Sequence, residues 1–174
     1  INFFDVGPNS PVNISDEMEE WIEVRGNNPV TEFGLMSPYK RVNDVYGSLL
    51  RPGNITVIVA RSGVGKTRFC MDFCTKVSSE YNVPVLHFDN GEMSKEELIV
   101  RQCSALSGVS ANLLETGQWR QAGEEIVDKV RAVWAKVKKI KFYYYNVGGM
   151  SVDNMTATLR RFYYSKIGRG NPMI

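Results

Sequence analysis

One stretch of the chain carries residue types that bind phosphate. Ser62–Thr67 reads Ser-Gly-Val-Gly-Lys-Thr and follows an apolar, β-branched run over Ile55–Val59. Gly63 and Gly65 permit backbone angles that turn successive N–H groups toward one anion. A helix that follows such a loop points the positive end of its dipole at the same place. We therefore expect a buried strand over Ile55–Val59, then a phosphate-binding loop, then a helix.

The side chains at the end of this loop suit a nucleoside triphosphate. Lys66 can reach the β- and γ-phosphates, and the Thr67 hydroxyl can hold Mg²⁺. The usual pattern begins with glycine, where this chain has Ala60. Alanine is the mildest replacement, and it falls at the end of the expected strand. Arg68 is a further candidate for nucleotide contact, although a surface position explains it equally well. The candidate binding residues are thus Ser62, Gly63, Val64, Gly65, Lys66, Thr67 and Arg68.

Two carboxylates follow a second short apolar run, Val83–Phe88. In open α/β sheets ligands bind at the carboxyl ends of the strands, and a carboxylate there can activate the water that attacks a γ-phosphate. Asp89 ends the run like a residue that binds Mg²⁺ through water, whereas Glu92 suits a catalytic base. Both also fit an ordinary acidic loop before a helix, capped by Ser94 with Glu97 as its capping-box partner.

Apolar residues elsewhere recur at helical spacing between short apolar or aromatic runs. This alternation predicts an α/β fold with a mostly parallel sheet, since each parallel crossover needs a connecting helix. The last four residues resemble the opening of one more strand. The expected helices follow Thr67 and cover 94–108, 126–137 and 151–167, and the expected strands cover 83–88 and 140–147.

The chain divides into a short N-terminal part and a larger domain. Residues 1–34 read as an extended arm and a short linker-type helix, with Ser15 or Asp16 as N-cap and Glu19 as the capping-box partner of Asp16. The apolar face of that helix covers this domain or docks on a neighbouring subunit. Residues 35–174 form the main domain.

Composition indicates a soluble globular protein. Of 174 residues, 43% are hydrophobic and 23% charged, and the net charge is only +2. No apolar run reaches the roughly 18 residues that a membrane span needs. With no signal-peptide pattern, a cytoplasmic location is expected. Cys70, Cys74 and His87 are the conceivable metal ligands, but small buried core residues explain the cysteines better.

A surface for nucleic acid would have to be local, because the net charge is small. Basic and aromatic residues gather near the C-terminus, where they could bind a single strand through charge and stacking. A solvated helix face and tyrosines packed on a sheet explain them better. These residues are Tyr143, Tyr144, Tyr145, Arg160, Arg161, Phe162, Tyr163, Tyr164, Lys166 and Arg169.

Several motifs together resemble one family. Leu50–Thr67 is similar to the first motif of DnaB-type replicative helicases, members of the RecA-like ATPase superfamily, in which Ala-Arg often precedes the glycine loop. Glu92–Ser94 resembles the family's glutamate motif, and Thr116–Gln118 its threonine-glycine turn. The helix over 151–167 resembles the one before the family's Walker B strand. The resemblance covers about residues 35–174, in the right order and spacing.

The resemblance implies a RecA-like P-loop fold that uses ATP and Mg²⁺. Ser62–Thr67 would bind the triphosphate, Lys66 would neutralise developing charge, and Thr67 would ligate Mg²⁺. Glu92 would be the general base, which makes Asp89 the weaker candidate for a metal ligand. The implied protein is a homo-oligomer, a hexameric ring, that moves on single-stranded DNA at a replication fork and unwinds the duplex.

Other functions stay open at this point. In the family, the Walker B aspartate, the DNA-contacting loops and the arginine finger follow the strand that would begin at the C-terminus of this chain. A RecA-type recombinase or a clock-type ATPase would share the motifs seen here. A nucleotide-binding or assembly module without turnover is a further alternative, and we expect very weak hydrolysis from residues 1–174 alone.

Overall fold

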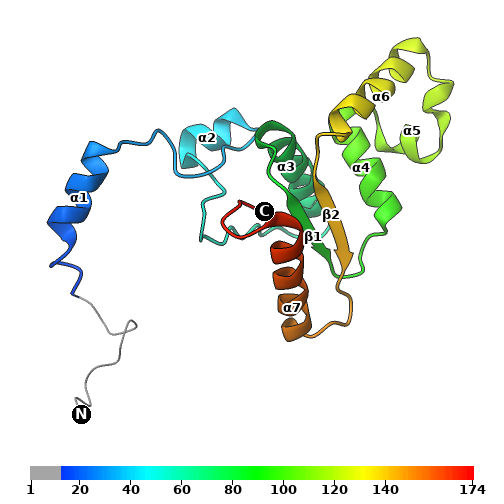
Figure 1. Ribbon diagram of the computed structural model, residues 1–174. Coiled ribbons are helices and arrows are strands. Elements are labelled where there is room, and N and C mark those ends of the chain that lie inside the picture. The colour runs from blue at the N-terminus through cyan, green and yellow to red at the C-terminus, as the bar shows by residue number, and fades with distance from the viewer. Residues whose placement is uncertain (1–12) are drawn as a thin grey trace. The chain divides into compact units, whose positions relative to one another are not determined.

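The computed structural model describes residues 13–174 (Figure 1). The chain divides into two units, one ending at Phe33 and one running from Gly34 to Ile174. Most of the expected N-terminal arm, residues 1–12, lies outside the described residues. Each unit is described by itself below.

The first unit contains one helix, α1 (Met18–Asn27). The expected N-cap is wrong: the helix begins after Glu17, which makes no side-chain cap. The carboxylate of Asp16 instead accepts a hydrogen bond of 2.8 Å from the side-chain amide of Asn13. This side chain is therefore used in the turn before the helix, where it cannot also cap the first helical amides.

The apolar side chains of α1 stay exposed. Arg25 covers part of this surface, because its guanidinium lies 5.0 Å from the Trp21 ring and 5.2 Å from that of Phe33. A cation over an aromatic face is attracted by the ring quadrupole. More than half of the surface of each of the following side chains is nevertheless accessible: Met18, Trp21, Ile22 and Val24.

The second unit is built on a small parallel sheet. Strand β1 (Val85–Asp89) pairs with β2 (Phe142–Asn146), from Val85 opposite Phe142 to Asp89 opposite Asn146. The predicted parallel α/β arrangement is confirmed for these strands. On the other side of β1, Ile174 donates to the carbonyl of Pro84 and accepts from the amide of Leu86. The end of the chain thus lies beside β1, as expected for a strand opening there.

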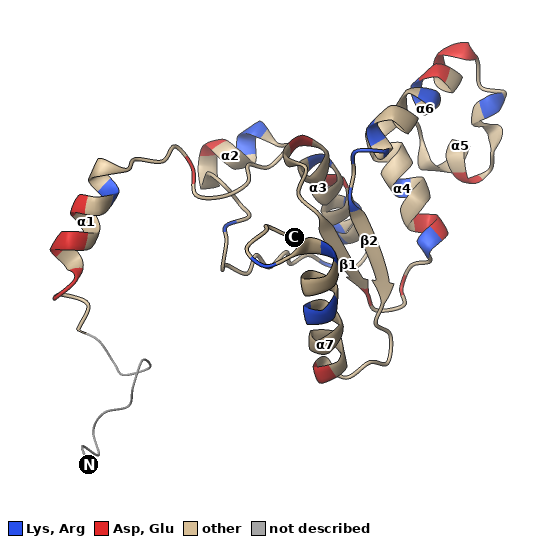
Figure 2. Cartoon of the chain, in the orientation of Figure 1, with Lys and Arg blue, Asp and Glu red and all other residues tan. Residues whose placement is uncertain are grey.

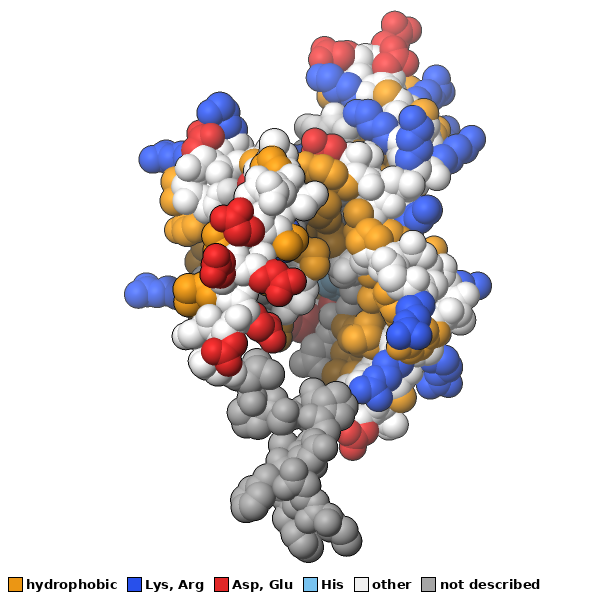
Figure 3. Space-filling model, turned by 60° about the vertical axis from the view of Figure 1, so that its left-hand side comes forward, with side chains coloured by type: hydrophobic (Ala, Val, Ile, Leu, Met, Phe, Trp, Pro, Cys, Tyr) orange, Lys and Arg blue, Asp and Glu red, His pale blue; other side chains and the backbone are white. Residues whose placement is uncertain are grey.

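The expected strand over Ile55–Val59 is wrong. The segment has no strand hydrogen bonds within the described residues, and Ile55 and Val59 are 89% and 85% exposed. Its β-branched residues favour an extended chain, but a strand also needs a neighbouring main chain to pair with. No described strand lies alongside it. Figure 3 shows hydrophobic side chains reaching the molecular surface in several places.

Helices supply most of the core of this unit. The buried hydrophobic residues lie on α3, α4 and α6, in or beside the two strands, and between α4 and α5; they are Met71, Phe73, Val77, Val83, Val85, Leu98, Val109, Val130, Val133 and Val147. Figure 1 shows α4, α5 and α6 grouped together. The helices are α2 (Lys40–Tyr46), α3 (Lys66–Tyr81), α4 (Lys95–Ser107), α5 (Ala111–Glu115), η2 (Gln118–Arg120), α6 (Glu124–Val137), α7 (Val152–Phe162) and η3 (Tyr163–Ile167).

Local sequence signals fix several helix ends. Ser94 and Glu97 form the predicted capping box of α4, each side chain bonded to the other residue's amide. Gly108 ends the same helix with φ of 72°, which glycine adopts without a steric penalty. The hydroxyl of Ser151 caps α7 in the same way as Ser94. The predicted helix over 151–167 changes to a π turn at Tyr163, because Gly168 bonds back to that carbonyl.

Within the described residues, no helix is both long and apolar enough to cross a membrane.

Candidate functional site

The glycine loop adopts the conformation that its residues predict. It turns through Ser62–Val64 and ends at Gly65, the N-cap of α3. Gly63 has φ of 77° and Gly65 φ of 99°, values that side-chain-bearing residues rarely adopt. A Cβ at either position would meet no atom within 4 Å, so backbone conformation rather than crowding demands glycine here. The 16-residue α3 directs its dipole into the turn.

Lys66 lies at the first position of α3 and bends back over the loop. Its ammonium group donates to the carbonyl of Ala60 at 3.1 Å and to that of Arg61 at 3.3 Å. Thr67 is half-buried beside it, and its hydroxyl has no hydrogen-bond partner among the described residues. An oxygen of this kind suits Mg²⁺, which needs only one or two protein ligands when phosphate and water supply the rest. The loop therefore fits a phosphate with its metal.

Arg68 projects from α3 into the wall of a cavity of about 380 Å³. The cavity begins at Gly65, and Phe69 and Arg101 also line it. The Tyr39 ring also lines the cavity and stacks on Phe69, with ring centroids 5.4 Å apart. Among the described residues neither arginine has an acidic partner, so both are available to an anion.

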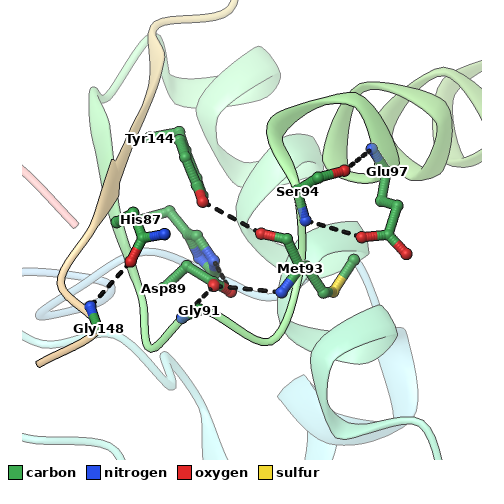
Figure 4. Close-up of polar contacts among 9 residues, drawn as sticks. His87, Asp89, Gly91, Met93, Ser94, Glu97, Tyr144 and Gly148 are labelled. Atoms are coloured by element: carbon green, nitrogen blue, oxygen red, sulfur yellow. Dashed lines mark hydrogen bonds and ion pairs between the residues drawn. The ribbon is translucent and has the colours of Figure 1, made fainter.

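Asp89 and Glu92 lie at the carboxyl end of β1, on one turn, in very different surroundings. Asp89 is only 6% exposed, and its Oδ1 accepts from the amides of Gly91 at 2.7 Å and Met93 at 3.2 Å (Figure 4). Burial acts to raise the pKa of Asp89, but these two amides and the neighbouring His87 lower it below its ordinary value. Asp89 is therefore ionised at neutral pH, and Oδ1 is already engaged by the protein.

Glu92 lies between the two amides that Asp89 binds. Its side chain is exposed and has no hydrogen-bond or ion-pair partner among the described residues. A carboxylate at this edge of a parallel sheet can accept a proton from water, provided that its backbone is held in place. The carboxylate of Asp89 is thus held by hydrogen bonds, whereas that of Glu92 is unpaired among the described residues.

The conceivable metal ligands do not come together. No group of three or more His, Cys, Asp or Glu able to hold a metal occurs in the part of the chain that the structure describes. Cys70 and Cys74 lie partly buried on α3, as expected for core residues. His87 packs on the rings of Phe142 and Tyr144, with centroids 6.0 and 6.2 Å away.

Several of the aromatic residues near the C-terminus make contacts within the fold. The Tyr143 ring packs edge-on against Phe162 with centroids 4.8 Å apart, which joins β2 to α7. Tyr163 donates to the carbonyl of Asn171. Arg160 and Arg161 lie in the last turn of α7, where positive charge favours the helix dipole (Figure 2).

Sequence reasoning missed the contact that Tyr144 makes. Its hydroxyl donates to the carbonyl of Met93 at 3.1 Å, from the neighbouring strand. The register that places Tyr144 opposite His87 brings this hydroxyl to the turn. A run of three tyrosines gives no local sign of which one reaches a loop about fifty residues away.

These features define a class: α/β proteins with a parallel sheet and a glycine turn at the N-terminus of a long helix. The comparison with known sequences then narrows the class. Residues 34–169 match the family described as the DnaB-like helicase C terminal domain. The chain belongs to this family, as the motifs over 35–174 predicted.

Individual relatives agree with the family match. The chain is 29% identical over 163 residues to the replicative DNA helicase DnaB of Buchnera aphidicola subsp. Baizongia pistaciae, covering 93% of this chain and 34% of that protein. DnaB of Pasteurella multocida is 25% identical (85% and 31% covered). A probable plasmid replicative DNA helicase of Chlamydia psittaci is 26% identical (82% and 30% covered). The chain thus spans about a third of the length of these curated relatives.

Proposed function

We propose that this chain is the nucleotide-binding part of an ATP-driven motor that unwinds DNA during replication. Membership of the DnaB-like helicase family supports the class of activity. The observation that carries the proposal is the glycine turn at the N-terminus of α3, with Lys66 folded over it. Single-stranded DNA as the track and a hexameric ring as the assembly belong to the same proposal, through membership of the DnaB-like helicase family.

Lys66 is the residue that senses the triphosphate. With no anion in the loop its ammonium group bonds to the carbonyls of Ala60 and Arg61. These neutral acceptors bind a cation less strongly than phosphate oxygens do. The ammonium group therefore turns to the phosphates on binding, while the amides of the turn and the α3 dipole hold the remaining charge.

Glu92 is the general base. Its exposed carboxylate has no competing partner among the described residues, so it can accept the proton of the attacking water. The Thr67 hydroxyl would hold Mg²⁺, which would supply positive charge next to the phosphates. Arg68 contacts the nucleotide from the cavity wall next to Gly65.

Substitution of Lys66 tests the nucleotide site in the full-length protein. Lys66→Ala removes the positive charge over the loop and should lower the rate of ATP hydrolysis by on the order of a hundredfold or more. The matched control is Lys76→Ala, a second lysine on α3, which pairs with Asp72 at 2.8 Å instead. Hydrolysis and ATP binding are measured for both variants. Equal rates for Lys66→Ala and the unmodified protein would refute the proposal.

Substitution of Glu92 tests the assignment of the base. Glu92→Gln keeps the size of the side chain but cannot take up a proton, so we expect hydrolysis to fall by about a hundredfold to ten-thousandfold. ATP affinity, measured by equilibrium titration, should stay within about twofold because the phosphate loop is intact. Unchanged hydrolysis would assign the base to another residue.

A further inference from the structure

We propose that Asp89 is a positioning residue: its buried carboxylate fixes the backbone on both sides of Glu92 and so aims the base. The inference rests on the proposed role of Glu92. It gives Asp89 a role different from that of a Mg²⁺ ligand, which its place at the end of β1 otherwise suggests.

The hydrogen bonds of Asp89 bracket the base. One oxygen, Oδ1, accepts from the amide before Glu92, that of Gly91, and from the amide after it, that of Met93. Because the amides of Gly91 and Met93 bind the same carboxylate oxygen, the backbone from Gly91 to Met93 is held to Asp89. Because the Asp89 carboxylate is almost fully buried, its removal would take away the hydrogen-bond partner that the fold supplies to both amides.

Asp89 is itself held in place. It is the last residue of β1, opposite Asn146 in β2, so its backbone belongs to the sheet. The second oxygen, Oδ2, faces the Nε2 atom of His87 at 3.6 Å, too far for a good hydrogen bond but close enough for attraction to a charged ring. No other described group bonds to this buried Nε2. Asp89 therefore fixes the position of the turn relative to the sheet.

The other side of the turn is fastened by β2. Tyr144 donates to the carbonyl of Met93, and Figure 4 shows its hydroxyl pointing at the turn from the neighbouring strand. A Cβ on Gly148 would lie 3.4 Å from the carbonyl oxygen of Asn90, so the exit of β2 also passes close to the turn. Glu92 therefore has an anchored backbone and a free side chain, the combination that a base acting on a bound water requires.

Two substitutions at Asp89 distinguish the effect of its hydrogen bonds from the effect of its charge. Asp89→Ala removes the acceptor and leaves two amides unpaired, whereas Asp89→Asn keeps an oxygen that both amides can reach. In the full-length protein we expect Asp89→Ala to lower kcat for ATP by on the order of tenfold to a hundredfold, with KM within about twofold. Asp89→Asn should restore kcat to within about threefold of the unmodified value.

Ser151→Ala is the matched control for lost stability. It removes the hydroxyl that caps α7, which accepts from the Asn154 amide at 3.3 Å, and it leaves both bonds of the Asp89 carboxylate in place. It should lower the unfolding midpoint and leave kcat per folded molecule unchanged. Tyr144→Phe, which removes only the bond to Met93, should lower kcat by a smaller factor than Asp89→Ala, and it serves if the alanine variant does not fold.

Three results would overturn the inference. The first is an unchanged kcat in Asp89→Ala. The second is a loss that appears in KM alone. The third is an Asp89→Asn variant as impaired as Asp89→Ala, because the charge, as in a metal ligand, would then be what matters. Glu92→Gln distinguishes failure of the proposed function from failure of this inference. If that variant hydrolyses ATP at the normal rate, Glu92 is not the base, whatever the Asp89 variants show.

Discussion

Packing changes the chemistry of Cys74. It lies on α3 one turn from Cys70, among side chains that face the core. Burial, with a smaller effect of Cys70, raises the pKa of the Cys74 thiol to about 11. Since only the thiolate attacks an alkylating reagent, we expect Cys74 in the folded protein to react with iodoacetamide at pH 8 at least about tenfold more slowly than a cysteine in an unfolded chain.

Peptide mass spectrometry of protein quenched at intervals measures this rate. The same protein in denaturant gives the reference rate, and full reaction there shows that the thiol is reduced. Equal rates in the folded and denatured states would contradict the raised pKa of Cys74.

Residue roles were predictable where they depend on neighbours in sequence. The positive φ angles of Gly63 and Gly65 follow from a Gly-Val-Gly-Lys-Thr run before a helix. The engagement of Asp89 did not follow, because it needs a turn that brings two amides back to a strand end. The Tyr144 contact needs, in addition, the register between two strands.

At the scale of elements, Gly34 shows how closely one segment crosses another. Leu35 and Leu50 form an isolated antiparallel bridge, and the Leu35 amide donates to the Leu50 carbonyl at 2.9 Å. A Cβ on Gly34 would lie 2.2 Å from that carbonyl oxygen, which no real contact allows. A side chain at this position would therefore force the two backbones apart.

Gly34→Ala should consequently destabilise the second unit. We expect the free energy of unfolding to fall by about 1–3 kcal/mol, the usual cost of forcing atoms into a packed site. Urea denaturation followed by circular dichroism measures this change. Gly26→Ala is the control: nothing lies within 4 Å of its Cβ, and alanine favours the α1 helix that contains it. A Gly34→Ala variant as stable as the control would show that the bridge yields without cost.

Helices and strands differed in how far sequence predicted them. The capping box of Ser94 and Glu97 is complete within four residues, so α4 was predictable with its start. The cap of α1 was not, since the Asp16 side chain bonds to Asn13 instead. The run over Ile55–Val59 has strand propensity, but pairing depends on what lies beside it, which propensity does not contain.

At the scale of the whole molecule, β1 is the most fully paired segment of the sheet. The Val85 amide donates to Lys141 on one side and the Leu86 amide to Ile174 on the other. Residues 55–59 contrast with it, because no main-chain hydrogen bond holds them within the described residues. A side-chain hydrogen bond of 2.8 Å does join the segment to its neighbours, from the Thr56 hydroxyl to the Leu49 carbonyl. The two segments thus differ in their main-chain hydrogen bonding.

Amide hydrogen exchange of the 174-residue chain should reveal this difference. Amides over 55–59 should exchange about as fast as those of an unstructured peptide, while those of Val85 and Leu86 should be slower by orders of magnitude, because exchange there requires local opening of the sheet. Repeating the measurement over a dilution series separates the isolated chain from associated copies, since an extended apolar segment with free amides is a template for pairing. Protection of 55–59 that persists on dilution would mean that the segment pairs within the chain, and protection lost on dilution would mean that it pairs between chains.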